Sequence, residues 1–155
     1  QLEASNDILA LDIDGISGIG TQGLHSGGGA PVANTGRAVF EMDADETLTA
    51  AADVLVLIDE VYATTDLVET ALEASGSREI NMLATGADLL AGDSIAVVWS
   101  DGSNSYLGHL ATSALDVSDT ATFASGATTL TTLVEMTGVD VSTTGRFTAT
   151  NFTLI

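Results

Sequence analysis

Short apolar runs and two-residue alternation dominate the hydrophobic pattern of this chain. They predict strands at residues 7–13, 38–42, 54–58, 79–83, 94–99, 105–110, 128–136 and 152–155. The run at 54–58, Val-Leu-Val-Leu-Ile, does not alternate, which is typical of a strand buried on both faces. The sequence Asp-Gly-Ser-Asn at 101–104 joins two predicted strands and favours a hairpin.

Helical periodicity is confined to the middle of the chain. Residues 66–74 predict a helix capped by Thr65, with Glu69 on its solvent side. Its predicted apolar stripe consists of Leu67, Val68, Ala71 and Leu72. Residues 86–92 predict a short helical turn or a loop. We therefore predict a mainly β fold of antiparallel, sandwich-like sheets with one or two short helices.

A glycine-rich stretch separates the first predicted strand from the rest. With 155 residues, the chain has the length of one domain. We divide it into an N-terminal strand segment (1–14), a glycine-rich tether (15–36) and a main body (37–155). Gly18-Ile19-Gly20-Thr21-Gln22-Gly23 matches the dinucleotide-binding pattern, but the residues that follow cannot form the helix that holds a pyrophosphate. A flexible loop is the better interpretation.

The net charge of the chain restricts its possible functions more than any motif does. The chain has 22 acidic and three basic side chains, for a net charge of −19, yet 45% of its residues are hydrophobic. The charge repels nucleic acid and anionic lipid and attracts multivalent cations, of which calcium suits carboxylate ligands. Alternatively, the carboxylates keep the surface hydrated in salty surroundings. The sequence lacks an apolar run of membrane-spanning length, so we expect no membrane span.

Paired aspartates are the candidate calcium ligands. Side chains two residues apart on a strand point the same way, so two carboxylates can share one cation. None of the pairs completes the twelve-residue calcium loop of an EF-hand. The candidates are Asp12 and Asp14, and Asp43 and Asp45, which are two residues apart, with Asp116 and Asp119, three residues apart, as a comparable cluster.

Candidate catalytic residues are scarce. His25 and His109 are the two histidines, and neither lies in a zinc-binding or nucleophile-elbow motif. Cysteine is absent, which excludes disulfides, thiolate metal sites and cysteine nucleophiles. We therefore expect no enzymatic activity.

Four segments between Thr49 and Ile155 carry a family resemblance: ADVLVLIDEVYATTDLVETAL, DSIAVVWSDGSNSYLGHLATSALD, LTTLVEMTGVDV and TATNFTLI. This region resembles the C-terminal module of large, acidic proteins exported by type I secretion, a group that includes RTX-type calcium-binding proteins. The resemblance implies an extracellular or cell-surface location and contact of the C-terminal end with the secretion machinery. The glycine-rich calcium nonapeptide of RTX repeats is absent here, because GISGIGTQG has no aspartate.

These observations favour a non-enzymatic extracellular structural domain of a surface or matrix protein. We expect it to assemble with copies of itself by strand pairing, assisted by calcium, with residues 2–14 reaching a neighbour. We also expect the chain to be part of a longer protein or, alternatively, a mature protein cleaved after a leader. Two other functions remain open: a passive C-terminal export module, or a phage-type structural subunit such as a tail-tube or decoration protein.

Overall fold

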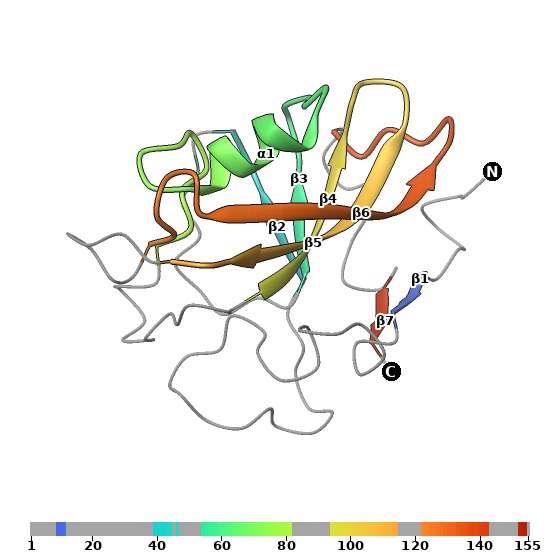
Figure 1. Ribbon diagram of the computed structural model, residues 1–155. Helices are drawn as coiled ribbons and strands as arrows, with labels where there is room; N and C mark the ends of the chain where they lie inside the picture. The colour runs from blue at the N-terminus through green and yellow to red at the C-terminus, as the bar shows by residue number, and fades with distance from the viewer. Residues whose placement is uncertain are drawn as a thin grey trace.

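The structure is a computed structural model that describes residues 9–11, 39–44, 46, 54–81, 94–114, 122–142 and 152–154. Five of the described strands form one sheet, and a single short helix accompanies them (Figure 1). The predicted mainly β class with a short helix is thus confirmed. The glycine-rich tether 15–36 and the predicted turn at 86–92 lie outside the described residues.

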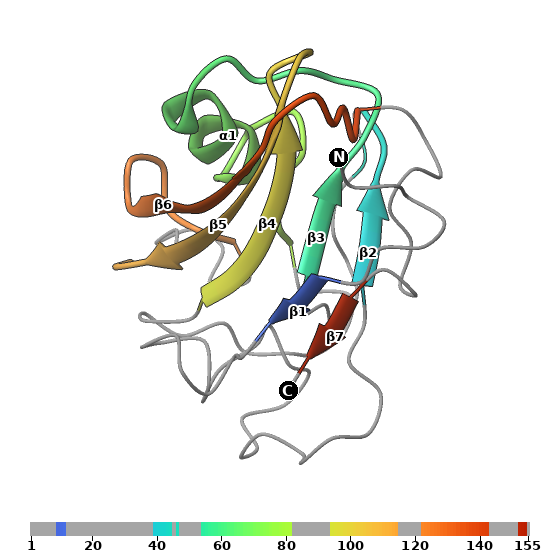
Figure 2. The same cartoon turned by 90° about the vertical axis from the view of Figure 1, so that its right-hand side faces the viewer.

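The five-strand sheet has the order β2-β3-β4-β5-β6. Its first half is parallel: β2 pairs with β3, and β3 pairs with β4. Its second half is antiparallel, from β4 through β5 to β6. Figure 2 shows β2, β3 and β4 pointing the same way. The strands are β2 (Val39–Met42), β3 (Val54–Leu57), β4 (Ser94–Ser100), β5 (Ser105–Thr112) and β6 (Thr128–Met136).

The predicted antiparallel pairing holds for the half of this sheet from β4 to β6, whereas β2, β3 and β4 pair in parallel. A helix lies between β3 and β4 in the chain, and a crossover of this kind returns the chain to the same edge and makes the two strands parallel. That helix also covers one face of the sheet, in the place where a sandwich would have a second sheet. The predicted hairpin at 101–104 is confirmed, because it joins antiparallel β4 and β5.

The helix α1 (Thr65–Leu72) packs on the sheet through Val68, Ala71 and Leu72. Its N-cap is Thr64 rather than the predicted Thr65, and its C-cap is Glu73. Leu67, which we predicted to belong to the apolar stripe, is 51% exposed. A helix of two turns that rests on a sheet buries only a narrow stripe, and Leu67 falls beside it.

Two apolar clusters lie on opposite faces of the sheet, because alternate residues of a strand point to opposite sides. The first includes Leu55, Leu57, Val97 and Trp99 together with the α1 residues. The second includes Val54, Val56, Ala96 and Val98, and is closed by Val139 and Val141. All four residues of β3 are buried, as its continuous apolar run predicts.

A close approach between β5 and its neighbours requires a glycine. A Cβ atom at Gly108 would lie 2.8 Å from Cδ1 of Leu130 and 2.9 Å from Cζ3 of Trp99. Gly108 lies opposite Thr132 of β6, next to a register shift where β6 has one extra residue opposite β5. Leu107 pairs with Val134 and Gly108 with Thr132, so Leu133 is the extra residue of this β-bulge.

The first and last strands of the chain pair with each other. β1 (Leu9–Leu11) runs parallel to β7 (Phe152–Leu154) and forms a separate two-stranded sheet (Figure 2). β1 and β7 lie within the predicted strands 7–13 and 152–155, whose other residues lie outside the described residues. The predicted strand at 79–83 is reduced, in the described residues, to an isolated bridge between Asn81 and Thr122.

Candidate functional site

Carboxylates gather where the parallel strands β2 and β3 end. Because these strands pair in register, the residues that follow them emerge at the same edge of the sheet. Ile58 donates its N–H to the carbonyl of Met42 (3.1 Å), which holds the two strand ends together. Asp43 follows β2, and Asp59 follows β3 with a left-handed backbone (φ 61°). The Asp43 backbone N–H binds the carboxylate of Glu46 (2.9 Å).

The electrostatics of Asp43 reflect this crowding. Partial desolvation, a side-chain hydrogen bond with Asp59, and the nearby charges of Asp59 and Glu46 raise the pKa of Asp43. The chain thus places acidic groups together at the ends of two neighbouring strands. Such a group of carboxylates attracts cations from solution.

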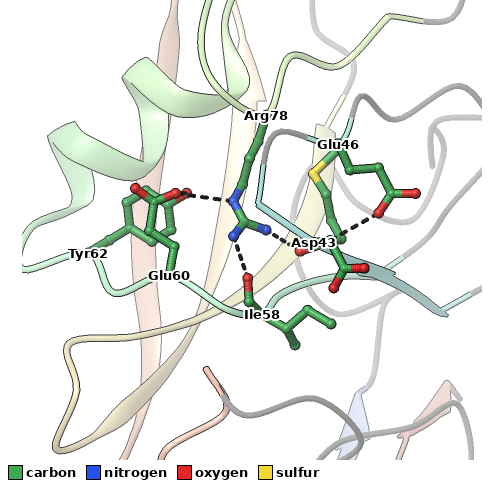
Figure 3. Close-up of polar contacts among 7 residues, drawn as sticks. Asp43, Glu46, Ile58, Glu60, Tyr62 and Arg78 are labelled. Carbon is green, nitrogen blue, oxygen red and sulfur yellow. Dashed lines mark hydrogen bonds and ion pairs between the residues drawn. The ribbon is translucent and has the colours of Figure 1, made fainter.

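Arg78 joins the two strand ends from inside (Figure 3). Its side chain is fully buried, and its terminal nitrogens donate hydrogen bonds to the carbonyls of Met42 and Ile58. Its Nε lies 3.4 Å from Oε2 of Glu60, and its guanidinium lies 5.9 Å from the ring centroid of Tyr62. All three guanidinium nitrogens therefore have acceptors within the protein. Arg78 acts as a structural tie between β2 and β3.

A shallow groove of about 350 Å³ runs beside α1. Glu60, Tyr62 and Leu67 are among the residues that line it. The Tyr62 hydroxyl donates to Glu60 (2.7 Å), and desolvation followed by that hydrogen bond raises the pKa of Tyr62 well above its ordinary value. The phenol therefore stays protonated at physiological pH, and the polar groups of this groove are directed at each other.

The hairpin between β4 and β5 uses its aspartate in a similar way. Oδ1 of Asp101 accepts the N–H groups of Ser103 and Asn104, each at 2.8 Å, and Oδ2 accepts the Tyr106 hydroxyl at 2.8 Å. These hydrogen bonds, of which the one from Asn104 is the largest cause, lower the pKa of Asp101. The ring of Tyr106 stacks on Trp99 with centroids 5.4 Å apart. The carboxylate is thus engaged in holding the turn.

His109 is the one predicted catalytic candidate that the structure describes; His25 lies outside the described residues. His109 is half-buried on β5, between Ala96 of β4 and Thr131 of β6 in the register. Its Nε2 has no hydrogen-bond partner within the described structure. Burial lowers the pKa of His109, so the imidazole is neutral near physiological pH.

Of the six predicted calcium ligands, Asp43 alone falls in the described part of the chain. Asp12, Asp14, Asp45, Asp116 and Asp119 lie outside the described residues. The structure brings Asp43 beside Asp59 and Glu46. Among the described residues there is no group of three or more acidic or histidine side chains arranged to hold a metal ion.

The outer edge of β6 is divided into two halves. In the first half, carboxylates from α1 and its C-cap bind the outward-facing N–H groups: Glu69 accepts from Leu130, and Glu73 accepts from Thr128 (3.0 Å). Glu73 also accepts from the Thr128 hydroxyl (2.6 Å) and the Gly126 N–H (2.7 Å), and it is buried. These contacts block an edge that would otherwise present unpaired backbone groups.

In the second half of β6, residues 131–135 are all exposed. Leu133 and Val134, at the bulge, are 41% and 39% exposed. Strand alternation turns the backbone of Thr132 outward, as it does that of Leu130 two residues earlier. Among the described residues nothing accepts the Thr132 N–H. Within the described residues, this part of the strand is therefore an edge without a covering carboxylate, and it carries an apolar pair of side chains. We call residues 131–136 the open edge.

No family model, curated protein or solved structure matches this chain. The described part of the chain also has no helix with the length and apolar character of a membrane span. The candidate site therefore rests on the geometry of the chain itself, and its most distinctive feature is the open edge of β6.

Sequence reasoning identified Asp43, but it missed Asp59, Arg78 and the half-covered edge. The sequence contained a signal for the proximity of Asp59 to Asp43. Each aspartate follows a predicted strand, and parallel pairing of the two strands brings the residues after their carboxyl ends together. Glu69 was expected in solvent, whereas its carboxylate reaches the backbone of Leu130. That contact joins residues 61 positions apart, and no local pattern predicts it.

Proposed function

We propose that this chain is a non-enzymatic structural domain of a secreted surface or matrix protein that assembles with copies of itself through the open edge of β6. The observation that carries the proposal is that Glu69 and Glu73 protect the first half of β6, whereas no described residue protects its second half. Natural proteins protect edges that must not pair, and an exposed edge with apolar side chains is suited to adding another strand.

A structural role is supported by how the chain uses its polar side chains. Arg78 holds two strand ends, Asp101 holds a turn, and Glu73 holds the start of β6. Each of these groups is engaged with the backbone of its own chain. This is the pattern of a scaffold in which the polar side chains stabilise the fold.

Self-association must overcome the net charge of −19. Two copies repel each other at long range, and divalent cations reduce this repulsion more effectively than monovalent salt at the same concentration. The acidic edge beyond β2 and β3 is one place where such ions gather. We propose calcium as the assisting ion, because carboxylate oxygens are its preferred ligands.

The secreted location rests on the composition and on the family resemblance of residues 49–155. An acidic, cysteine-free chain suits an extracellular environment that is rich in calcium. In this proposal the C-terminal end of the chain contacts the secretion machinery during export, before the protein folds.

The test is the molar mass of the chain, measured by light scattering in millimolar calcium and then in chelator. We expect a reversible increase in mass with calcium and a smaller one in sodium chloride of matched ionic strength. Leu133→Asp, which adds a charge to the open edge, should abolish the increase. Val61→Asp is the matched control, because it adds the same charge at a side chain that is 52% exposed and belongs to the segment between β3 and α1 rather than to β6.

A chain that stays monomeric in every condition would overturn the proposal and favour the passive export module. Assembly that resists Leu133→Asp would show that another surface is responsible. Equal assembly in calcium and in sodium chloride of matched ionic strength would show that screening of the charge, rather than calcium binding, allows the copies to associate.

A further inference from the structure

The hairpin between β4 and β5 contains a chemically labile pair of residues, Asp101-Gly102. Aspartate isomerises most readily when glycine follows it, because glycine has no side chain to shield its backbone nitrogen. The turn nevertheless requires glycine at this position, where φ is 91°, a conformation that other residues rarely adopt. The shape of the turn therefore imposes the labile sequence.

The isomerisation passes through a cyclic imide. The backbone nitrogen of Gly102 attacks Cγ of the protonated Asp101 carboxyl group, and a new N–Cγ bond forms. The carboxyl hydroxyl combines with the amide proton and leaves as water. A second water molecule then opens the imide. Cleavage of the N–Cγ bond restores aspartate, whereas cleavage of the bond from the nitrogen to the backbone carbonyl carbon gives isoaspartate, which adds one CH2 group to the main chain.

The structure engages the attacking nitrogen in the turn. The N–H of Gly102 donates to Oγ of Ser100 (2.9 Å), and this hydroxyl donates in turn to the carbonyl of Asn104 (3.1 Å). Ser100 is fully buried, so its hydroxyl is held in place. Because the attack removes the proton from the Gly102 nitrogen, this hydrogen bond has to break before the imide can form.

The carboxylate of Asp101 is engaged at both oxygens. Oδ1 accepts the N–H groups of Ser103 and Asn104, and Oδ2 accepts the hydroxyl of Tyr106, each at 2.8 Å. Imide formation expels one of the two oxygens as water, so hydrogen bonds are lost whichever oxygen leaves. The same bonds lower the pKa of Asp101 and favour the ionised carboxylate, which is a poorer electrophile than the protonated acid.

We propose that Asp101 is a site of isoaspartate formation that the folded hairpin holds in check through Ser100 and Tyr106, so that isomerisation proceeds when the turn opens. This inference is independent of the proposed function, because it concerns the chemistry of a single chain.

The modification would affect β6 as well as the turn. The carbonyl of Asn104 accepts the N–H of Asp101 (3.0 Å), while its side chain donates to Glu135 (3.3 Å) and accepts the N–H of Gly138 (2.9 Å). An additional CH2 group between residues 101 and 102 lengthens the turn and displaces Asn104 from these partners. Isomerisation therefore loosens the end of β6.

The test is incorporation of solvent oxygen during incubation in heavy-oxygen water at mildly acidic pH. Each passage through the imide adds one solvent oxygen, so the peptide gains mass even when aspartate re-forms. Digestion in ordinary water and electron-transfer fragmentation then locate the label and identify isoaspartate. The same chain in urea gives the rate without the fold. We expect labelling at Asp101 to be at least about tenfold slower in the folded chain.

Two variants test the contacts. Tyr106→Phe removes one donor to the carboxylate but keeps the ring that stacks on Trp99, and Ser100→Ala removes the acceptor of the Gly102 N–H. We expect each to accelerate labelling at Asp101 by about tenfold, because the loss of one hydrogen bond makes local opening more frequent.

Tyr62→Phe is the matched control, because it removes a tyrosine hydroxyl that donates to Glu60, outside the hairpin. Its labelling at Asp101 should equal that of the wild type. Circular dichroism confirms that each variant is folded. If the buried Ser100→Ala substitution prevents folding, the comparison of Tyr106→Phe with Tyr62→Phe decides the outcome.

Acceleration in Tyr106→Phe without acceleration in Tyr62→Phe supports the proposal. Labelling at Asp101 that is as fast in the folded chain as in urea would overturn it, because the turn would then give no protection. Slow labelling that is equal in Tyr106→Phe and Tyr62→Phe would also overturn it, because protection would not depend on the contacts of the carboxylate.

Discussion

At the scale of single residues, Arg78 shows how a very acidic chain uses a rare cation. It is one of three basic residues, and its side chain is fully buried against backbone carbonyls. A long-range attraction to carboxylates alone would leave an arginine at the surface. Here the planar guanidinium instead donates hydrogen bonds to the carbonyls of Met42 and Ile58 at the ends of their strands, in addition to the bond that Met42 accepts from the Ile58 N–H.

Removing this tie should destabilise the fold. We expect Arg78→Met to lower the free energy of unfolding by about 2 kcal/mol, because the Ile58 carbonyl loses its guanidinium donor and the Met42 carbonyl keeps only the N–H of Ile58. Arg78→Lys should recover only part of the loss, because an ammonium group lacks the planar fork. Urea unfolding followed by Trp99 fluorescence measures both variants. Glu60→Gln is the control with a small expected effect, since the Glu60 side chain is 44% exposed. Equal stability of Arg78→Met and the wild type would contradict the structural role.

Asp101 and Asp43 should respond to pH with opposite signs. The pKa of Asp101 is lowered in the fold, so its contribution to stability is present above the ordinary value of about 3.9 and disappears as the pH falls through the folded pKa. The pKa of Asp43 is raised, so its contribution is present at low pH and disappears as the pH rises through the folded pKa.

The measurement is the unfolding free energy of Asp101→Asn and Asp43→Asn relative to the wild type, from pH 6 downward in steps. The deficit of Asp101→Asn should shrink as the pH falls. Asp43→Asn should be relatively more stable near neutral pH and lose this advantage on acidification. Two curves with the same slope would refute the assignment of either carboxyl.

At the scale of elements, the contact between α1 and β6 decides which part of the edge is free. Glu69 and Glu73 are four residues apart, about one helical turn, so their side chains lie on the same side of α1. The N–H groups that they bind, in Leu130 and Thr128, are two residues apart on one strand. One turn of the helix therefore places two carboxylates at two successive outward N–H groups of β6, and the helix ends at the second carboxylate.

Loss of the buried carboxylate should open the first half of β6. We expect Glu73→Ala to lower the free energy of unfolding by about 2–3 kcal/mol, because the N–H groups of Gly126 and Thr128 lose their acceptor. Glu73→Gln should lose less, since its amide oxygen still accepts one of them. Amide hydrogen exchange measures the effect locally: Thr128 should exchange faster in Glu73→Ala, while Val97 in the sheet centre stays protected. Unchanged protection at Thr128 would contradict the carboxylate contact.

Much of the element plan was predictable from local pattern. β4, the 101–104 turn, β5 and β6 follow from apolar runs separated by turn residues, and β6 has the predicted bounds. Parallel pairing was missed, although two signals were present: the non-alternating run of β3 and the helix between β3 and β4. Together they are typical of a strand–helix–strand crossover. The bulge at Leu133 could not be predicted, because it arises from pairing with β5 rather than from the sequence of β6.

At the scale of the whole molecule, charge and hydrophobicity act against each other. Two apolar clusters cover both faces of the sheet, while the net charge of −19 favours expansion of the chain. The folded state concentrates that charge in a smaller volume than the unfolded state does. Ionic strength therefore changes the stability of this fold as well as its association.

We expect the thermal unfolding midpoint to rise by several degrees between about 0.01 M and 0.15 M sodium chloride, as the screening length falls from about 30 Å to 8 Å. Calorimetry at low protein concentration measures this without assembly. Leu133→Asp provides the control, because its response to salt should match the wild type if assembly does not contribute. A midpoint that falls with salt would show that attractive charge contacts dominate instead.

The pairing of β1 with β7 has a mechanical consequence. Tension applied to the two ends of the chain pulls these strands in opposite directions along their length, because they run parallel. All the hydrogen bonds between them are then loaded together, whereas pulling across a strand pair opens its hydrogen bonds one after another. Force passing through this molecule meets the short terminal pair in its stronger direction before it reaches the five-strand sheet.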